Sequence, residues 1–151
     1  MSFSGRKSGM DQYKMQSVQG GVESATPHRL IQMLMEGALE KIAAAKLHME
    51  QNEIAKKGEN ISVAISIIDG LRVSLDKPTG GEIAQNLDDL YEYMGHILLQ
   101  ANLKNDVSLL DEVSKLLNEI KGAWDAIPDD IVMDHASKVK GEDDQAVSNG
   151  G

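Results

Sequence analysis

The chain has 151 residues and a formal net charge of −9. This length fits one domain with tails, and the acidic balance argues against binding of nucleic acid through a broad basic surface. Hydrophobic residues make up 41% of the sequence and aromatic residues only 3%, so the core of that domain must be aliphatic.

The absence of cysteine excludes a disulfide framework, a thiolate metal site and a cysteine nucleophile. No apolar run approaches the length that spans a bilayer, and no hydrophobic signal region follows the N-terminus. We therefore expect a soluble, cytoplasmic protein that does not insert into membranes.

Composition separates the two ends of the chain from its middle. Residues 1–12 are rich in Ser, Gly and Lys, and residues 129–151 are polar and acidic. Both are predicted to be disordered tails. Residues 26–128 form the domain, and residues 13–25 are a short segment that precedes it.

Within the domain, helical periodicity begins at a clear start signal. The Thr26-Pro27 pair supplies a hydroxyl N-cap and a proline at the first helical position, so a first helix is expected over about residues 26–51. A second helix is expected over about residues 60–75, because Gly58 and Asn60 interrupt the pattern before it.

The second half of the domain repeats this organisation. Residues 76–81 contain a proline and two glycines and are predicted to be a stop and turn. A third helix then spans about residues 82–102. A fourth is capped by Asn105 or Asp106 and is stopped by Pro128. Short connections between four helices predict an all-α, antiparallel, up-down-up-down four-helix bundle.

The helical faces differ in width. The third and fourth helices carry apolar stripes of roughly 120° and 140°, which are the widths that packing into a bundle core buries. The stripe of the third helix begins at Ile83. In the second helix, Val63 and Ile67 widen the apolar arc to roughly 200°, and the first helix is similar. We expect the surplus to be covered by the N-terminal segment, a second copy of the chain or another protein. The alternative is that a wide stripe simply lies beside two neighbouring helices.

Glycines fall inside the predicted helices, where each costs about 1 kcal/mol relative to alanine. Gly70 lies beside Val63 and Ile67, where a missing side chain would let the backbone of a partner approach closely. Gly95 and Gly122 fall off the core stripes, and the sequence offers no reason for either.

Catalytic and metal-binding patterns are missing. A di-iron carboxylate site in a bundle needs Glu-x-x-His on two helices, but Glu92 and His96 are one residue too far apart and lie on a polar face. The pair Gly80-Gly81 is not followed by the Lys and Ser or Thr of a phosphate loop. We therefore expect no catalytic residue, no metal, no cofactor and no enzymatic activity.

A series of short pieces carries a family resemblance along residues 13–127. They are Tyr13 and Ser17-Val18; Ala25-Thr26-Pro27, Leu30, Met33-Leu34 and Glu36-Gly37-Ala38; Leu75-Asp76; Gly80-Gly81-Glu82-Ile83-Ala84, Asn86-Leu87, Leu90-Tyr91 and Tyr93-Met94; Ala101-Asn102, Asp106 and Trp124. In their order and spacing the chain resembles the FliS family of flagellin export chaperones. It departs from that family at Met35, where tyrosine is common, and at Gln16, where asparagine is common.

The resemblance implies a cytoplasmic chaperone whose N-terminal segment, here residues 13–25, folds over the bundle as a cap. It also implies binding of the disordered C-terminal segment of flagellin, prevention of premature polymerisation, and delivery to a component of the flagellar type III export gate. The family's flagellin segment wraps around the bundle, and the cap can occupy part of its site.

These expectations define a partner-binding site. An amphipathic flagellin segment is expected to lay apolar side chains on the second helix, in the helix-in-groove mode. The same groove is expected to be covered by the N-terminal segment when it is empty. The residues of this site are Tyr13, Met15, Val18, Val63, Ile67, Gly70 and Val73. The alternative function is a homodimeric bundle scaffold or a regulatory binding module that uses the same wide faces.

Overall fold

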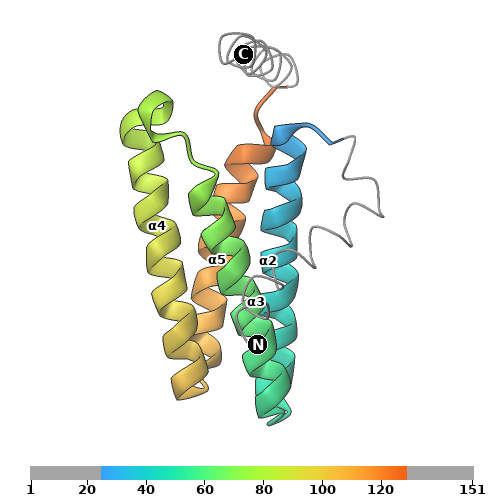
Figure 1. The fold of residues 1–151 in the computed structure, drawn as a ribbon. Coiled ribbons are helices and arrows are strands. Elements are labelled where there is room, and N and C mark those ends of the chain that lie inside the picture. Colours follow the sequence, from blue (N-terminus) through green and yellow to red (C-terminus); the bar gives the residue numbers. More distant parts are fainter. Residues whose placement is uncertain (1–24, 129–151) are drawn as a thin grey trace, which may run out of the picture.

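The computed structural model describes residues 25–128, which form four α-helices. They are α2 (Pro27–Glu50), α3 (Ile54–Val73), α4 (Lys77–Lys104) and α5 (Val107–Asp125) (Figure 1). The predicted tails, and residues 13–24 of the predicted cap, lie outside the described residues.

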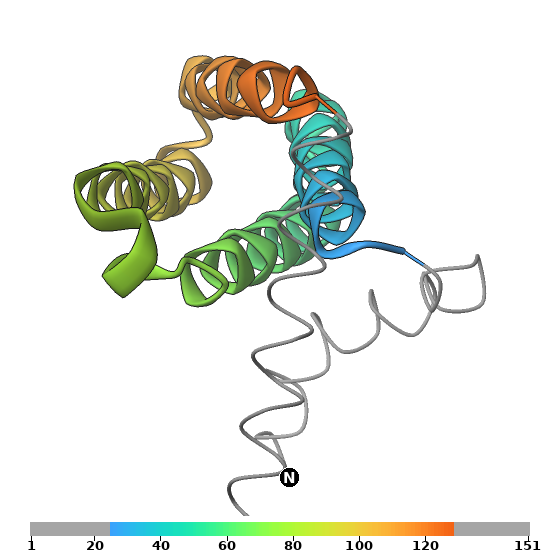
Figure 2. The same cartoon turned by 90° about the horizontal axis from the view of Figure 1, so that it is seen from above.

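The helices run alternately up and down (Figure 1). Each helix packs against the next along the chain, and α5 returns to α2, so that the four stand around a common centre in the view from above (Figure 2). No strand occurs among the described residues. The predicted all-α, up-down-up-down four-helix bundle is therefore confirmed.

The core is aliphatic, as the composition predicts. Its largest fully buried side chains come from all four helices and are Met35, Ile42, Ile61, Ile67, Ile68, Leu71, Met94, Leu98, Leu110, Val113 and Leu117. The ring of Tyr91 also lies in the core, and its burial raises the pKa of the Tyr91 hydroxyl to about 12.

The predicted helix starts agree with the structure at two places. The Oγ1 of Thr26 accepts a hydrogen bond from the backbone N–H of Arg29 at 3.1 Å, and Pro27 opens α2. Asp106 is the N-cap of α5, and its carboxylate accepts from the backbone N–H of Ser108 at 2.9 Å. The hydroxyl of Ser108 also donates to the Asp106 carboxylate, at 2.6 Å, and this bond, followed by the backbone N–H bond, holds the pKa of the Asp106 carboxyl below its usual value.

The second helix begins earlier than the sequence predicts, at Ile54. Gly58 lies inside it, where an added Cβ would sit 4.0 Å from Oδ1 of Asn102 on α4. Asn60 also stays helical, and its side-chain amide donates to the carbonyl of Lys56 one turn earlier at 2.8 Å. Local breakers therefore do not end a helix that packs along its length.

The predicted turn at residues 76–81 is wrong in part. Asp76 is the N-cap of α4, its carboxylate accepting from the backbone N–H of Thr79 at 3.3 Å. Residues 77–80 then form a helical turn that breaks at Gly81, with φ 55° and ψ −129°. A side chain rarely adopts that positive φ, so glycine is needed at this kink.

A cluster of charges joins α3 to α4 near the kink. Asp88 of α4 is 7% exposed. Its carboxylate accepts from Nε of Arg72 at 2.9 Å and from Nζ of Lys77 at 3.1 Å. The hydrogen bond from Arg72, followed by that from Lys77, holds the pKa of the Asp88 carboxyl below its usual value. The ends of α3 and α4 are thus held together through one carboxylate.

Asp88→Asn is expected to lower the melting temperature at neutral pH, because it removes the charge that Arg72 and Lys77 share. The pKa of Asp88 is lower in the folded chain than in the unfolded chain, where it is about 4. The carboxylate therefore stabilises the fold fully above the unfolded pKa, and this stabilisation is lost as the pH falls through the folded pKa. Melting curves at several pH values should show the difference between wild type and variant shrinking below about pH 4.

Asp89→Asn at the exposed neighbouring carboxylate is the matched control. A loss of stability at Asp88→Asn that is equal at neutral and acidic pH, or equal to that of the control, would contradict the role of the Asp88 carboxylate.

Candidate functional site

One face of α3 turns away from the core. Val63, Ser66, Gly70 and Val73 follow one another at intervals of three and four residues, which places them on one side of a helix. We call these four residues the α3 stripe. Val73 is 85% exposed, and the other three are half-buried.

The middle of the α3 stripe is small and its hydroxyl is already engaged. The hydroxyl of Ser66 donates to the carbonyl of Ser62 one turn earlier at 3.1 Å. Gly70, one turn further on, has no side chain. The stripe therefore offers a shallow surface between two valines, and Val63 also packs against the core. Its chemistry suits contact with apolar side chains of another molecule.

The structure places Ile67 elsewhere than the sequence predicts. Its side chain is 0% exposed and belongs to the core with Ile68 and Leu71. Ile67 follows Ser66 in the sequence and is therefore rotated about 100° around the helix axis from it, which directs the Ile67 side chain inward. The expectation of an exposed Ile67 is wrong. At this residue the alternative interpretation of a wide stripe applies, because α3 packs against both α2 and α4.

The remaining predicted site residues, Tyr13, Met15 and Val18, lie outside the described residues. Their role as a cover for the groove stays a prediction.

Exposed apolar side chains also occur on α4, where the sequence analysis missed them. Leu99 is 51% exposed and Leu103 is 82% exposed. They stand four residues apart, on one side of the helix. The signal was available, because both lie opposite the apolar stripe of α4. Ile83 was assigned to that stripe but is 73% exposed, since it lies in the first turn after the kink at Gly81.

The titratable side chains in the described part of the chain do not gather into a metal site. Among the described residues, no three side chains of His, Cys, Asp or Glu are placed to hold a metal ion. Glu92 and His96 face each other along α4, with 3.8 Å between Oε1 and Nε2, as an exposed pair. No described helix is long and apolar enough to cross a membrane. The described surface does include exposed apolar side chains on α3 and α4.

Comparison with known proteins identifies the family. The family described as "Flagellar protein FliS" matches residues 9–130. The chain belongs to the FliS family. This confirms the resemblance that the sequence pieces carry.

Several relatives in this family are similar over most of their length. The chain is 55% identical to the flagellar secretion chaperone FliSB of Pseudomonas aeruginosa, over 78% of this chain and 94% of the relative. It is 50% identical to the flagellar secretion chaperone FliS of Salmonella typhimurium, over 80% of this chain and 90% of the relative. It is 35% identical to that of Bacillus subtilis, over 70% and 78%.

These three FliS relatives are named as secretion chaperones and none as an enzyme. The family membership therefore agrees with the expectation of a non-enzymatic chaperone.

Ile67→Asp and Val73→Asp should separate core from surface on the same helix. Ile67→Asp buries an unpaired charge, which costs on the order of several kcal/mol, so we expect loss of the helical circular dichroism signal. Val73→Asp places the same group in water, and we expect a melting temperature close to that of wild type. If Ile67→Asp melts like wild type, its assignment to the core is wrong.

Proposed function

We propose that this chain is a cytoplasmic export chaperone for flagellin. It binds the disordered C-terminal segment of newly made flagellin, prevents premature polymerisation, and aids secretion by the flagellar type III export apparatus. Membership of the FliS family supports this proposal most strongly, because the relatives are named as flagellar secretion chaperones. An accessible apolar face on a described helix is consistent with it.

The α3 stripe is the contact surface that we propose for flagellin. An amphipathic flagellin segment would lay its apolar side chains between Val63 and Val73, and its backbone would approach closely at Gly70. Removing a valine side chain from water contributes about 1.5–3 kcal/mol, so Val73 has the most to gain among the stripe residues at its 85% exposure. Ile67 takes part only by supporting the stripe from beneath.

A long flagellin segment would extend beyond α3 and contact a second helix. Leu99 and Leu103 on the outer side of α4 give it further apolar contacts. We also propose that the N-terminal segment, with Tyr13, Met15 and Val18, competes with flagellin for the α3 stripe. A component of the export gate would receive the loaded chaperone.

Calorimetry with a flagellin C-terminal peptide tests this surface. Val73→Asp is expected to weaken binding at least about tenfold, which corresponds to about 1.4 kcal/mol, because a carboxylate replaces an apolar contact. Asn118→Asp on α5 adds the same negative charge at an exposed position and should bind like wild type. Deletion of residues 1–18 should strengthen binding if the N-terminal segment competes. If all variants bind the flagellin peptide with equal affinity, the α3 stripe is not part of the flagellin site.

The second candidate function is a homodimeric scaffold that uses the same faces. The exposed Val73, Leu99 and Leu103 are compatible with self-association as well. Sedimentation distinguishes the two functions: a chain that is monomeric alone and forms a 1:1 complex with flagellin supports the chaperone. A stable dimer that does not bind flagellin supports the scaffold.

A further inference from the structure

Lys57 is a charged side chain that is buried at the end of the bundle where α2 connects to α3 and α4 connects to α5. It lies on the core side of α3 and is 4% exposed. Its Nζ donates to the backbone carbonyl of Asn102 at 3.0 Å and to Oδ1 of Asn105 at 2.5 Å. Both partners are neutral, and Lys57 forms no ion pair with a described carboxylate. Burial of an ammonium group is costly when no counter-charge accompanies it.

The ammonium group has a donor to spare. A lysine carries three N–H donors, and the two hydrogen bonds to Asn102 and Asn105 use two of them. The carbonyl of Asn102 belongs to the last turn of α4, whose negative helix end offsets part of the charge. One donor and part of the positive charge are left for another group.

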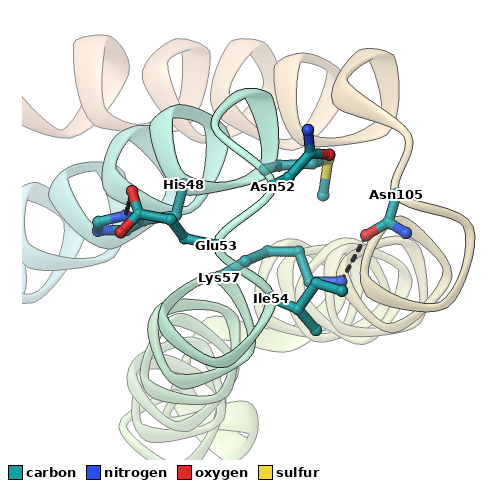
Figure 3. A pocket seen from close by; sticks show the side chains of 7 residues that line it. His48, Asn52, Glu53, Ile54, Lys57 and Asn105 are labelled. Atoms are coloured by element: carbon teal, nitrogen blue, oxygen red, sulfur yellow. Dashed lines mark hydrogen bonds and ion pairs between the residues drawn. The ribbon is translucent and has the colours of Figure 1, made fainter.

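A cavity of about 150 Å³ lies beside this group. It opens between the α2–α3 connection and the α4–α5 connection (Figure 3). The residues that line it are His48, Met49, Asn52, Glu53, Ile54, Lys57 and Asn105. A water molecule takes about 30 Å³ of liquid volume, so the cavity has room for a small polar group together with its water.

The two connections present their asparagines in the same unusual conformation. Asn52 has φ 59° and Asn105 has φ 51°, which places both in the left-handed region at the tips of their turns. Because Oδ1 of Asn105 accepts from Lys57, the amide nitrogen of Asn105 is oriented by that bond and keeps its own donors. Both asparagines therefore line the same cavity as Lys57.

The one carboxylate in the cavity wall is occupied elsewhere. The carboxylate of Glu53 lies 3.2 Å from Nδ1 of His48 and 3.2 Å from Nζ of Lys56. Figure 3 shows its carboxylate beside His48 and away from Lys57. These partners, His48 first, hold the pKa of the Glu53 carboxyl below its usual value. Glu53 thus stays charged without neutralising Lys57.

We propose that this cavity binds a carboxylate group, with Lys57 as its charged donor and the amides of Asn52 and Asn105 as further donors. A single negative charge matches the single lysine. Glu53 and the negative ends of α2 and α4 act on any anion here, and they repel a dianion such as phosphate more strongly than a singly charged carboxylate. Met49 and Ile54 give the wall an apolar side that suits the carbon chain of a carboxylic acid.

The test is a titration of the full-length, ¹⁵N-labelled chain with sodium acetate at constant ionic strength, followed by NMR. Acetate should give saturable amide shifts confined to residues 48–57 and 102–106, whereas inorganic phosphate and chloride should not. Lys57→Met keeps most of the side-chain volume and should weaken acetate binding at least tenfold. Lys115→Met, at an exposed position of α5, should bind like wild type.

Asn52→Gly provides a variant outside the core, because glycine adopts the left-handed conformation and lacks only the amide. It should weaken acetate binding several-fold with the fold intact. Wild type without saturable shifts, phosphate that binds as well as acetate, or Lys57→Met that binds like wild type would each overturn the proposal.

Two sources of a carboxylate are distinguished with acetyl-glycyl-leucine as the free acid and as the amide. Tighter binding of the free acid than of acetate assigns the cavity to a polypeptide C-terminus, and equal binding assigns it to a free carboxylate. Binding of the amide at the same amide resonances would contradict a carboxylate site. None of these outcomes depends on flagellin.

Discussion

The rotation of α3 about its own axis is the constraint on which the rest of the structure depends. Polar anchors to α4 set this rotation near both ends of the helix. At one end Arg72 donates to the buried carboxylate of Asp88, and at the other Lys57 donates to the carbonyl of Asn102. With both anchors in place, Ile61, Ile68 and Leu71 reach the core, and the α3 stripe turns outward. The core and the proposed contact surface are thus two sides of one packing arrangement.

The same anchors show how a small bundle combines burial with charge. Asp88 satisfies two cations at the α3–α4 connection, so its charge stabilises the fold while it is ionised. Lys57 meets only neutral acceptors, and we propose that its charge binds a carboxylate ligand. The aliphatic core between them needs no polar network. The binding surfaces that we propose therefore lie on the outer faces of α3 and α4 and at the α2–α3 and α4–α5 connections.

Local signals predicted the four helices, because N-caps and 3.6-residue periodicity depend only on neighbours in sequence. They failed at Gly58, which lies inside α3 although a glycine costs about 1 kcal/mol in a helix interior. They also failed at Ile67, because periodicity defines an apolar arc without saying which part of it neighbours cover. Lys57 could have been found, since it precedes Ile61 by one turn on the core side. The partner's identity came from family resemblance, which no single helix carries.

Site-specific crosslinking tests most directly whether the outward face of α3 is where flagellin binds. The chain contains no cysteine, so Val73→Cys creates a unique thiol at an exposed position for a benzophenone label. Asn118→Cys on α5 is the matched control at another exposed position. The account predicts a crosslink to flagellin from position 73 and little from position 118. Equal yields from both positions, or a crosslink from position 118 alone, would contradict it.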